Sequence, residues 1–248
     1  MTARLAAIWR HPIKGHGAEA LEAVTLKAGQ TMPWDRTWAV AHEVAKTDGQ
    51  DWAPCANFSR GAKAPKLMAI KARLDEARET VTLTHPDRPD LTFSPDREAA
   101  TFLDWVAPLM PADRAASARV VRVPGRGMTD SPFPSVSILG MSSLRALSDA
   151  AGRDLSPLRF RGNFWVEGTA PFEEFDWIGR RLRLGEAELE VRERIGRCKA
   201  TMTNPDTGTI DTDTLGVLQD QWGHTDLGVY AVVVAPGRVA LTDTLELL

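Results

Sequence analysis

The sequence predicts an α+β protein that is mostly β, built as antiparallel β-barrels with a few packed helices. Short apolar or alternating runs, the usual pattern of strands, recur between turn residues along the chain. Helical patterns occur in only a few segments, and no repeat of fixed period is present, which disfavours a solenoid or propeller. With 248 residues, 43% of them hydrophobic, the chain is long enough to bury a substantial core.

The first 94 residues have mainly strand patterns. Strands are expected in four runs: ARLAAIWR before Pro12, TWAVAHE, KLMAIKARL and TVTLTH. A loop rich in Asp, Pro and Ser is expected over residues 87–95, followed by an amphipathic helix in residues 96–110. We therefore predict an N-terminal β-barrel-like domain of residues 1–94 and a second β-barrel domain of residues 95–248.

The second domain is expected to contain two more helices among strands. Ser142 or Ser143 can cap a helix that Gly152 ends, and another short helix is expected over 213–220. Alternating segments predict strands in RGNFWVEG, in RRLRLGEAELEVRERIG with a hairpin at Gly185, and in GVYAVVVAPGRVAL with a hairpin at Pro236-Gly237.

Charge and cysteine content exclude several classes of function. The formal net charge is −3 and neither sign forms a long block, so we expect no nucleic-acid or anionic-membrane partner. The start of the chain lacks a signal or transit pattern, and the longest apolar run, 229–235, is far shorter than the ~20 residues of a membrane span, so we expect a cytoplasmic protein. Two distant cysteines indicate reduced thiols and cannot supply the about four ligands of an iron–sulfur cluster.

Cys198 lies between a strand pattern and the turn sequence NPDTG. Three interpretations are open: a small buried hydrophobe, a nucleophile paired with a histidine, and a soft thiolate ligand of a metal. Arg194 and Arg197 would favour the thiolate. Spacing alone leaves the structural and the functional interpretations equally open.

The pattern RC..T...PDTG..D, from Arg197 to Asp211, resembles the cysteine segment of MOSC-domain proteins. This family includes the C-terminal domain of molybdenum cofactor sulfurase and the amidoxime-reducing components. Its matching cysteine ligates molybdenum, so the resemblance implies that Cys198 is the metal ligand and a catalytic residue, a role that suits a soft sulfur. HPIKG with GQTMPWDRTWAV resembles the family's N-terminal barrel, and further matching segments extend the resemblance over nearly the whole chain.

The resemblance implies a molybdenum cofactor, that is, molybdenum held by molybdopterin. Its cofactor-binding residues carry over as Lys14, Arg36, Ser131, Arg161, Asn163, Arg197 and Tyr230. Cations from distant segments would suit the terminal phosphate of the pterin, because the planar fork of arginine can grip two phosphate oxygens. Gly15 and Gly196 depart from the family, since relatives carry serines at both positions.

Other side chains are weaker candidates. Asp211 or Asp213 would be a proton donor during removal of oxygen from a substrate, and we assign Asp211 to catalysis. His224 keeps a cysteine–histidine hydrolase open, although a loop histidine bonded to backbone is the simpler role. The family has a weak association with pyridoxal phosphate through a separate domain of the sulfurase. No Schiff-base lysine can be nominated here, so we do not expect that cofactor.

The leading functional hypothesis is a molybdenum-dependent oxidoreductase that reduces N-hydroxylated or N-oxide-type small molecules. Electrons would come from a separate donor such as a ferredoxin or flavoprotein, because the chain has neither iron–sulfur ligands nor a nucleotide-binding glycine fingerprint. The alternative is a non-catalytic carrier of the cofactor or of sulfur that uses Cys198. A third possibility is the cysteine hydrolase.

Overall fold

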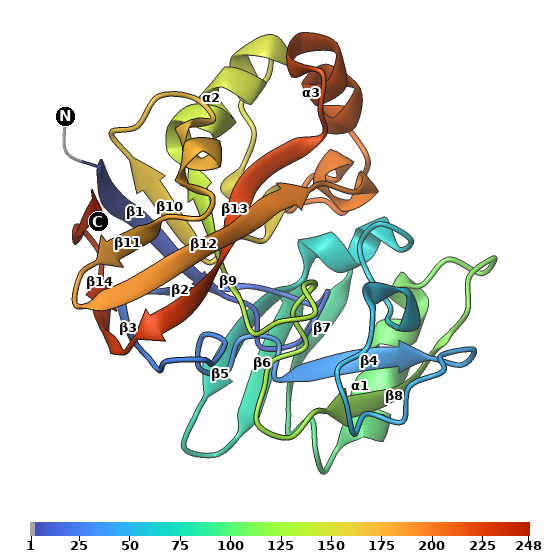
Figure 1. Ribbon diagram of the computed structural model, residues 1–248. Coiled ribbons are helices and arrows are strands. Elements are labelled where there is room, and N and C mark those ends of the chain that lie inside the picture. The colour runs from blue at the N-terminus through green and yellow to red at the C-terminus, as the bar shows by residue number, and fades with distance from the viewer. Residues whose placement is uncertain (1–2) are drawn as a thin grey trace.

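The computed structural model describes residues 3–248; residues 1 and 2 of the predicted first domain lie outside the described residues. Its largest element is a closed barrel of seven strands, at the upper left in Figure 1. The strands follow the order β1–β10–β9–β13–β12–β11–β15 and close back on β1. They are β1 (Ala3–Arg10), β9 (Val136–Gly140), β10 (Phe164–Glu167), β11 (Arg181–Leu184), β12 (Ala187–Gly196), β13 (Asp226–Ala235) and β15 (Thr244–Leu247).

The first strand of the chain is thus part of the barrel that the C-terminal half completes. The short β2 (Glu19–Leu21) extends the sheet beyond β1, and β3 (Ala23–Leu26) pairs with β14 (Gly237–Ala240). All pairs in the barrel are antiparallel except β9 with β10, which are parallel and connected through a helix. Alternation along β12 places Leu189 and Val191 in the barrel core.

A second body lies at the lower right of Figure 1 and contains two smaller sheets. One pairs β4 (Trp38–His42) with β8 (Ser117–Arg122), and the other joins β5 (Lys71–Asp75), β6 (Thr80–His85) and β7 (Arg88–Phe93). Helix α1 (Ala99–Val106) covers them, and its Phe102 stacks on Phe93 with ring centroids 5.0 Å apart. This helix therefore shares its core with strands that precede residue 95.

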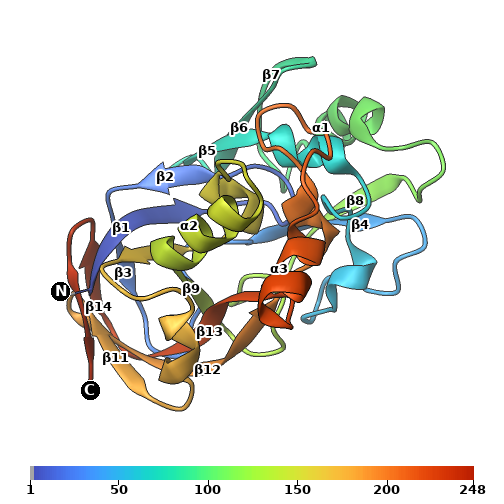
Figure 2. The same ribbon diagram turned by 90° about the horizontal axis from the view of Figure 1, so that it is seen from above.

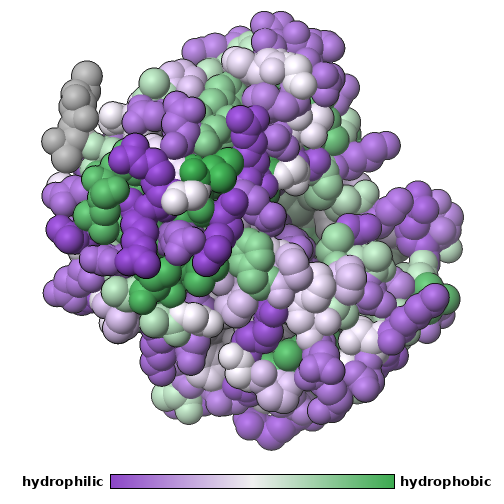
Figure 3. Space-filling view, in the orientation of Figure 1, coloured by the Kyte–Doolittle hydropathy of each residue, from purple (hydrophilic) through white to green (hydrophobic). Residues whose placement is uncertain are grey.

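Two helices cover the top of the barrel in Figure 1, and Figure 2 shows them from above. They are α2 (Met141–Ala150) and α3 (Thr214–Trp222). Short 3₁₀ helices complete the described chain: η1 (Cys55–Asn57), η2 (Pro65–Ala69), η3 (Ala107–Leu109), η4 (Pro157–Phe160), η5 (Glu173–Trp177) and η6 (Lys199–Met202). Among residues 3–248, each helix is too short or too polar to cross a membrane. The face in Figure 3 is mostly hydrophilic, with scattered apolar groups.

The predicted fold class is confirmed, as are the helix in 96–110, the helix that begins after Asp213 and the hairpin at Gly185. Four local predictions were wrong in whole or in part. The strand expected in KLMAIKARL begins only at Lys71, because Pro65–Ala69 forms η2. The loop expected over 87–95 contains β7, which pairs with β6. The segment after Pro236-Gly237 pairs with β3 and forms no hairpin with β13. Helix α2 is preceded by Gly140, with no side-chain cap.

The structure explains two of these errors, the missing side-chain cap of α2 and the pairing of β14. The hydroxyl of Ser143 donates to the buried Glu174 carboxylate at 2.8 Å, so it is unavailable as a cap. The partner of β14 is about 210 residues away in sequence, and local turn chemistry cannot reveal a pairing over such a separation. The division of the chain at residue 95 stays a prediction.

Candidate functional site

A cavity of about 210 Å³ lies between the barrel and the second body. The end of β12, η4 and η6 form one side, and the loop segments around residues 14–15, 36 and 55–62 form the other. Six of the predicted site residues line it: Lys14, Arg36, Arg161, Arg197, Cys198 and Tyr230. Residues that are far apart in the sequence thus meet at one concave surface.

Cys198 lies two residues after the end of β12 and immediately precedes η6. Its side chain is exposed at the cavity and its backbone carbonyl accepts hydrogen bonds from both the N–H and the hydroxyl of Thr201, each at 3.1 Å. The N–H of Arg197 donates to the Thr225 carbonyl at 2.9 Å. The thiol is therefore accessible and held on a fixed turn, as a metal-binding or reactive cysteine requires.

Arg36 and Arg161 form a pair of cations on one wall. The Arg36 guanidinium donates to the Arg161 carbonyl at 2.9 Å, and Arg161 donates to the Gly17 carbonyl at 3.1 Å. Both residues have left-handed backbones, with φ of 52° and 50°, an uncommon conformation for a residue with a side chain. Burial and the charge of Arg36 lower the pKa of Arg161 to about 9. Arg161 forms no ion pair with a carboxylate among residues 3–248.

The carboxylate of Asp35, next to this pair, already has partners within the fold. Asp35 forms an ion pair with Arg36 and accepts a hydrogen bond from the N–H of His11 at 2.8 Å. Burial alone would lower the pKa of Arg36, but Asp35 and Asp130 outweigh it and raise this pKa. Burial and the charges of Arg161 and Arg36 lower the pKa of His11 to about 3, so its ring is neutral and Asp35 is left to balance Arg36.

Lys14 is buried and points across the cavity. Its ammonium group donates to the Met128 carbonyl at 2.8 Å and to the carboxylate of Asp130 at 2.5 Å. Burial lowers the pKa of Lys14, while Asp130 opposes that change. Asp130 is exposed, and the charge of Lys14 outweighs the effect of desolvation and lowers its pKa. This pair is neutral overall and fixes the Lys14 side chain.

Arg197, just after β12, and Tyr230, in β13, also line the cavity. The Arg197 guanidinium donates to the carbonyls of Phe160 at 2.9 Å and Leu227 at 2.8 Å, so it holds η4 against β13. Burial lowers its pKa to about 10. Burial and the charge of Asp130 raise the pKa of Tyr230, so its hydroxyl remains a proton donor at neutral pH.

The cavity wall does not include Ser131, Asn163 or Asp211. Ser131 is buried and its hydroxyl bonds to the Ser135 hydroxyl at 2.6 Å. The Asn163 side chain accepts from the N–H and hydroxyl of Ser137, a residue that does line the cavity. These two predicted cofactor contacts therefore lie behind the wall.

The structure places Asp211 outside the cavity wall, in contact with two arginines and an asparagine. Its carboxylate accepts from Arg159 at 2.8 Å, from Arg153 at 3.1 Å and from the amide of Asn204 at 3.0 Å. Although desolvation opposes it, hydrogen bonding from Arg159 and Asn204 lowers the pKa of Asp211. An ionised carboxylate saturated with donors positions Arg159, which lines the cavity, and has no proton to give at neutral pH.

Among the cavity side chains that sequence reasoning missed are five polar, charged or thiol groups, those of Cys55, Arg60, Asp130, Ser137 and Arg159. The composition signals for them were weak. Asp130 directly precedes the chosen Ser131, and Arg159 lies two residues before Arg161. Cys55 and Arg60 lie in a loop after β4 with no recognisable pattern, so only the packing of that loop against η6 reveals them.

The two glycine departures have different structural reasons. Gly15 has a φ of 77°, and a Cβ there would lie 2.8 Å from the Ser59 carbonyl oxygen, so this backbone requires glycine. A Cβ at Gly196 would meet only a carboxylate oxygen of Asp226 at 3.6 Å, an ordinary contact. The serine of the relatives is sterically excluded at the first position and compatible with the second.

His224 lies away from the cavity wall. Its ring packs edge-on against Phe172 and Phe175, with centroid distances of 5.4 and 5.3 Å, and its Nδ1 accepts from the N–H of Asp226 at 3.1 Å. This is the backbone-bonded loop histidine expected from the sequence, and it gives the cysteine–histidine hydrolase no support.

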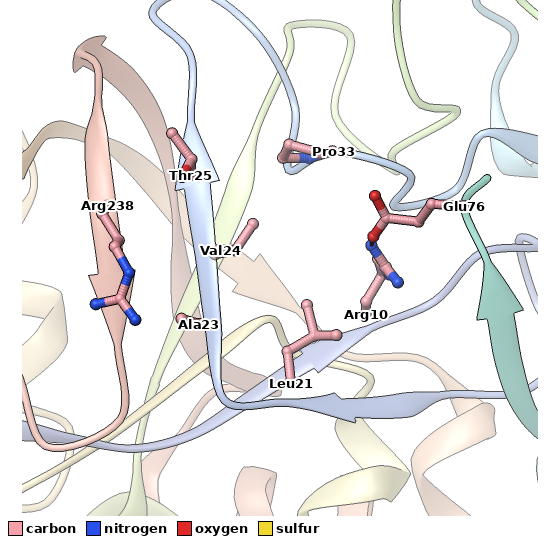
Figure 4. A pocket seen from close by; sticks show the side chains of 8 residues that line it. All are labelled: Arg10, Leu21, Ala23, Val24, Thr25, Pro33, Glu76 and Arg238. Atoms are coloured by element: carbon pink, nitrogen blue, oxygen red, sulfur yellow. Dashed lines mark hydrogen bonds and ion pairs between the residues drawn. The ribbon is translucent and has the colours of Figure 1, made fainter.

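A larger groove of about 360 Å³ lies beside β2 and β3 (Figure 4). Its one buried cation, Arg10, forms ion pairs with Glu19 at 2.7 Å and Glu76 at 2.5 Å. Arg10 is thus neutralised within the fold, and no cysteine is among the residues that line the groove. The smaller cavity is the better candidate site.

Comparison with known proteins assigns the family. The MOSC N-terminal beta barrel domain matches residues 2–117, and the MOSC domain matches residues 128–246. The chain belongs to the MOSC family. The matched segments meet at the cavity, because Lys14 and Arg36 come from the first and Arg161 and Cys198 from the second.

Two curated proteins and a solved structure are similar to this MOSC chain. Mitochondrial amidoxime-reducing component 1 of Danio rerio is 24% identical over 81% of the chain and 68% of its own length. Molybdenum cofactor sulfurase of Caenorhabditis briggsae is 32% identical over 41% of the chain, which spans only 15% of the sulfurase. The YUAD protein from Bacillus subtilis, 12% identical, covers 100% of the chain and 96% of its own with a TM-score of 0.49.

Proposed function

We propose that this protein binds the molybdenum cofactor in the cavity and works as an oxidoreductase on small N-hydroxylated or N-oxide-type molecules. One observation carries the proposal: an accessible thiol and a cluster of insufficiently neutralised arginines line the same small cavity. The family and the distant similarity to an amidoxime-reducing component support the same conclusion.

The residues present fit the cofactor. Arg161 and Arg197 form no ion pair with a carboxylate anywhere in residues 3–248, and burial lowers the pKa of both. A phosphate beside Arg36 and Arg161 would supply the missing negative charge, and guanidinium groups bind phosphate in a bidentate manner. The exposed Sγ of Cys198 is a soft donor of the kind molybdenum takes.

Each wall residue then has a defined task. Arg36, Arg161 and Lys14 would bind and orient the anionic end of the pterin, with Gly15 allowing close approach of the backbone. Cys198 would anchor the metal, and the protonated Tyr230 hydroxyl would donate a hydrogen bond within the cavity. When bound, the molybdenum cofactor supplies two-electron redox chemistry at its metal.

We further propose that the electrons come from a separate protein, a ferredoxin or a flavoprotein. The chain offers no cysteine set for an iron–sulfur cluster, since Cys55 and Cys198 are its only two cysteines. A second redox protein would therefore have to deliver electrons to the cavity.

Metal content and turnover together test the proposal. We would express the protein in a host that makes the cofactor, quantify molybdenum, and measure reduction of a hydroxylamine-type substrate with an artificial electron donor. We expect stoichiometric molybdenum and turnover in the wild type and loss of metal in Cys198→Ser. Cys55→Ser is the matched control, because it removes the other thiol of the cavity while Cys198 is retained.

Metal without turnover would favour the carrier, in which Cys198 holds the cofactor or sulfur in transit. Absence of molybdenum from the wild-type protein would contradict the oxidoreductase and the cofactor carrier and leave only the carrier of sulfur.

A further inference from the structure

Arg60 is a cation of the cavity wall whose charge neither a carboxylate nor the proposed cofactor balances. Its carbonyl accepts from the N–H groups of Lys63 and Ala64, each at 3.0 Å, so a tight turn fixes its backbone. Its half-buried side chain points along the cavity wall to Cys55, and the guanidinium donates to that Sγ at 2.7 Å. Within residues 3–248 it forms no ion pair with a carboxylate.

Three of the other five cations of the wall are paired with carboxylates, and the remaining two have backbone carbonyls or a proposed ligand as partners. Lys14 is paired with Asp130, Arg36 with Asp35 and Arg159 with Asp211. Arg197 directs its donors to two backbone carbonyls. Arg161, beside Arg36, is the counter-charge for the phosphate of the proposed cofactor. Arg60 lies in a different loop and remains positively charged after these partners are assigned.

The surroundings of Arg60 define a small subsite. Gly61, Ala62, Met68 and Ala200 line the cavity next to it, and a Cβ on Gly61 would lie 3.5 Å from that of Ala200. The Arg60 loop therefore packs against η6, directly after Cys198.

We propose that Arg60 binds an anionic group of the substrate, so that the preferred substrates are small N-hydroxylated or N-oxide-type molecules that also carry a carboxylate or a similar anion. This inference rests on the proposed function and specifies its substrate class. The apolar side chains beside Arg60 contact the body of the molecule, while the guanidinium takes the anion through charge-assisted hydrogen bonds.

A kinetic experiment with the molybdenum-loaded protein tests the substrate class. We would compare two N-hydroxylated amidines of equal size, one with a carboxylate and one with a carboxamide. The wild type should have the lower KM for the carboxylate. Arg60→Gln should raise the ratio of the KM for the carboxylate to the KM for the carboxamide by about tenfold or more. Arg60→Lys should keep part of the preference for the carboxylate. Lys63→Gln, an exposed cation three residues away, is the control and should leave the ratio unchanged.

A second experiment needs neither molybdenum nor turnover. In cofactor-free Cys198→Ser protein, iodoacetamide can react only with Cys55, and a carboxylate bound at Arg60 should shield that thiol. We expect benzoate to slow alkylation several-fold, benzamide to have no such effect, and Arg60→Gln to abolish the protection. If neither N-hydroxylated compound is reduced, the proposed function fails, whereas the alkylation result still decides whether Arg60 binds anions.

Two results would overturn the subsite. Equal protection by benzoate and benzamide would mean that Arg60 does not distinguish an anion from a neutral molecule of the same size. An alkylation rate of Cys55 that stays constant between about pH 6 and pH 9 would mean that Cys55 is already a thiolate and itself neutralises Arg60.

Discussion

The cavity at Cys198 and the groove at Arg10 are both concave and both contain buried arginines, yet they differ in how those charges are balanced. In the groove, Arg10 extends from a regular strand and forms ion pairs with Glu19 and with Glu76, of which Figure 4 draws Glu76. In the cavity, Arg161 has a left-handed backbone and no carboxylate partner among residues 3–248. The groove is the larger of the two, so volume does not identify the site.

The difference lies in what each arrangement contributes to the folded protein. A neutralised buried ion pair is complete within the chain, and removing one partner leaves an uncompensated charge. An arginine without a carboxylate is unfavourable until an anion arrives, as the lowered pKa of Arg161 indicates. Ligand sites can therefore be recognised where the fold leaves charge unbalanced.

The largest expected effect is a loss of molybdenum in Arg161→Gln that does not occur in Arg10→Gln. Arg161→Gln should reduce the molybdenum content of protein purified from a cofactor-producing host by about tenfold or more, because it removes a phosphate ligand. The free energy of unfolding of cofactor-free protein should not fall, because the variant removes a charge that burial disfavours. Metal analysis and urea denaturation measure the two effects.

Arg10→Gln is the opposite test. It should lower the free energy of unfolding by about 3 kcal/mol, because the nearly buried Glu19 loses its partner, while molybdenum content stays at the wild-type value. If Arg10→Gln lost the metal and Arg161→Gln only destabilised the fold, the comparison would be reversed.

The buried histidines behind the cavity should make the free energy of unfolding depend on pH in mild acid. Burial lowers the pKa of His11 to about 3 and of His16 to about 4, whereas both titrate near 6.5 in the unfolded chain. Between these values the unfolded state binds more protons, so the free energy of unfolding should fall as the pH drops from about 6.5 towards 4. Denaturation at several pH values measures the slope, and His16→Gln should flatten it. An unchanged slope in this variant would contradict the buried neutral ring.

The glycine positions provide an intermediate test. Gly15→Ser forces a side chain into a left-handed backbone and against the Ser59 carbonyl, so we expect a loss of about 1–3 kcal/mol in the free energy of unfolding. Gly196→Ser should change it by less than about 0.5 kcal/mol, since a Cβ fits there. Thermal and chemical denaturation of the pair tests this ranking, which equal losses would refute.

The smallest effect concerns Asp211. If its carboxylate only positions Arg159, Asp211→Asn should leave the pH dependence of kcat in place and change chiefly KM, since Asn204 and Arg153 still hold the turn. A shift or loss of one limb of the pH–rate profile would instead indicate that Asp211 is a catalytic proton donor.

Much of the fold follows from local patterns. Alternation predicted β1, β4, β6 and the hairpin of β11 with β12, and a short helix was expected over 213–220, where α3 lies. The errors at β7 and β14 come from partners that local signals do not specify: β7 is polar on one side and stable only against β6, and β14 depends on β3 from the other end of the chain.

The site divides in the same way. Motif resemblance identified Cys198, Lys14, Arg36 and Arg161, which do share a cavity. It chose Ser131, Asn163 and Asp211 as well, whose side chains the fold uses behind the wall. It missed Arg60 and Arg159, because a basic residue in a loop has no distinctive pattern until its surroundings are known.

By itself, the sequence determined the β-rich class, the order of most elements and the identity of the thiol, because side-chain periodicity and turn chemistry act over a few residues. Only the tertiary structure decided which charges are neutralised and which are left for a ligand. Ion pairing depends on distances between residues such as Lys14 and Asp130, and those distances exist only once the chain has folded.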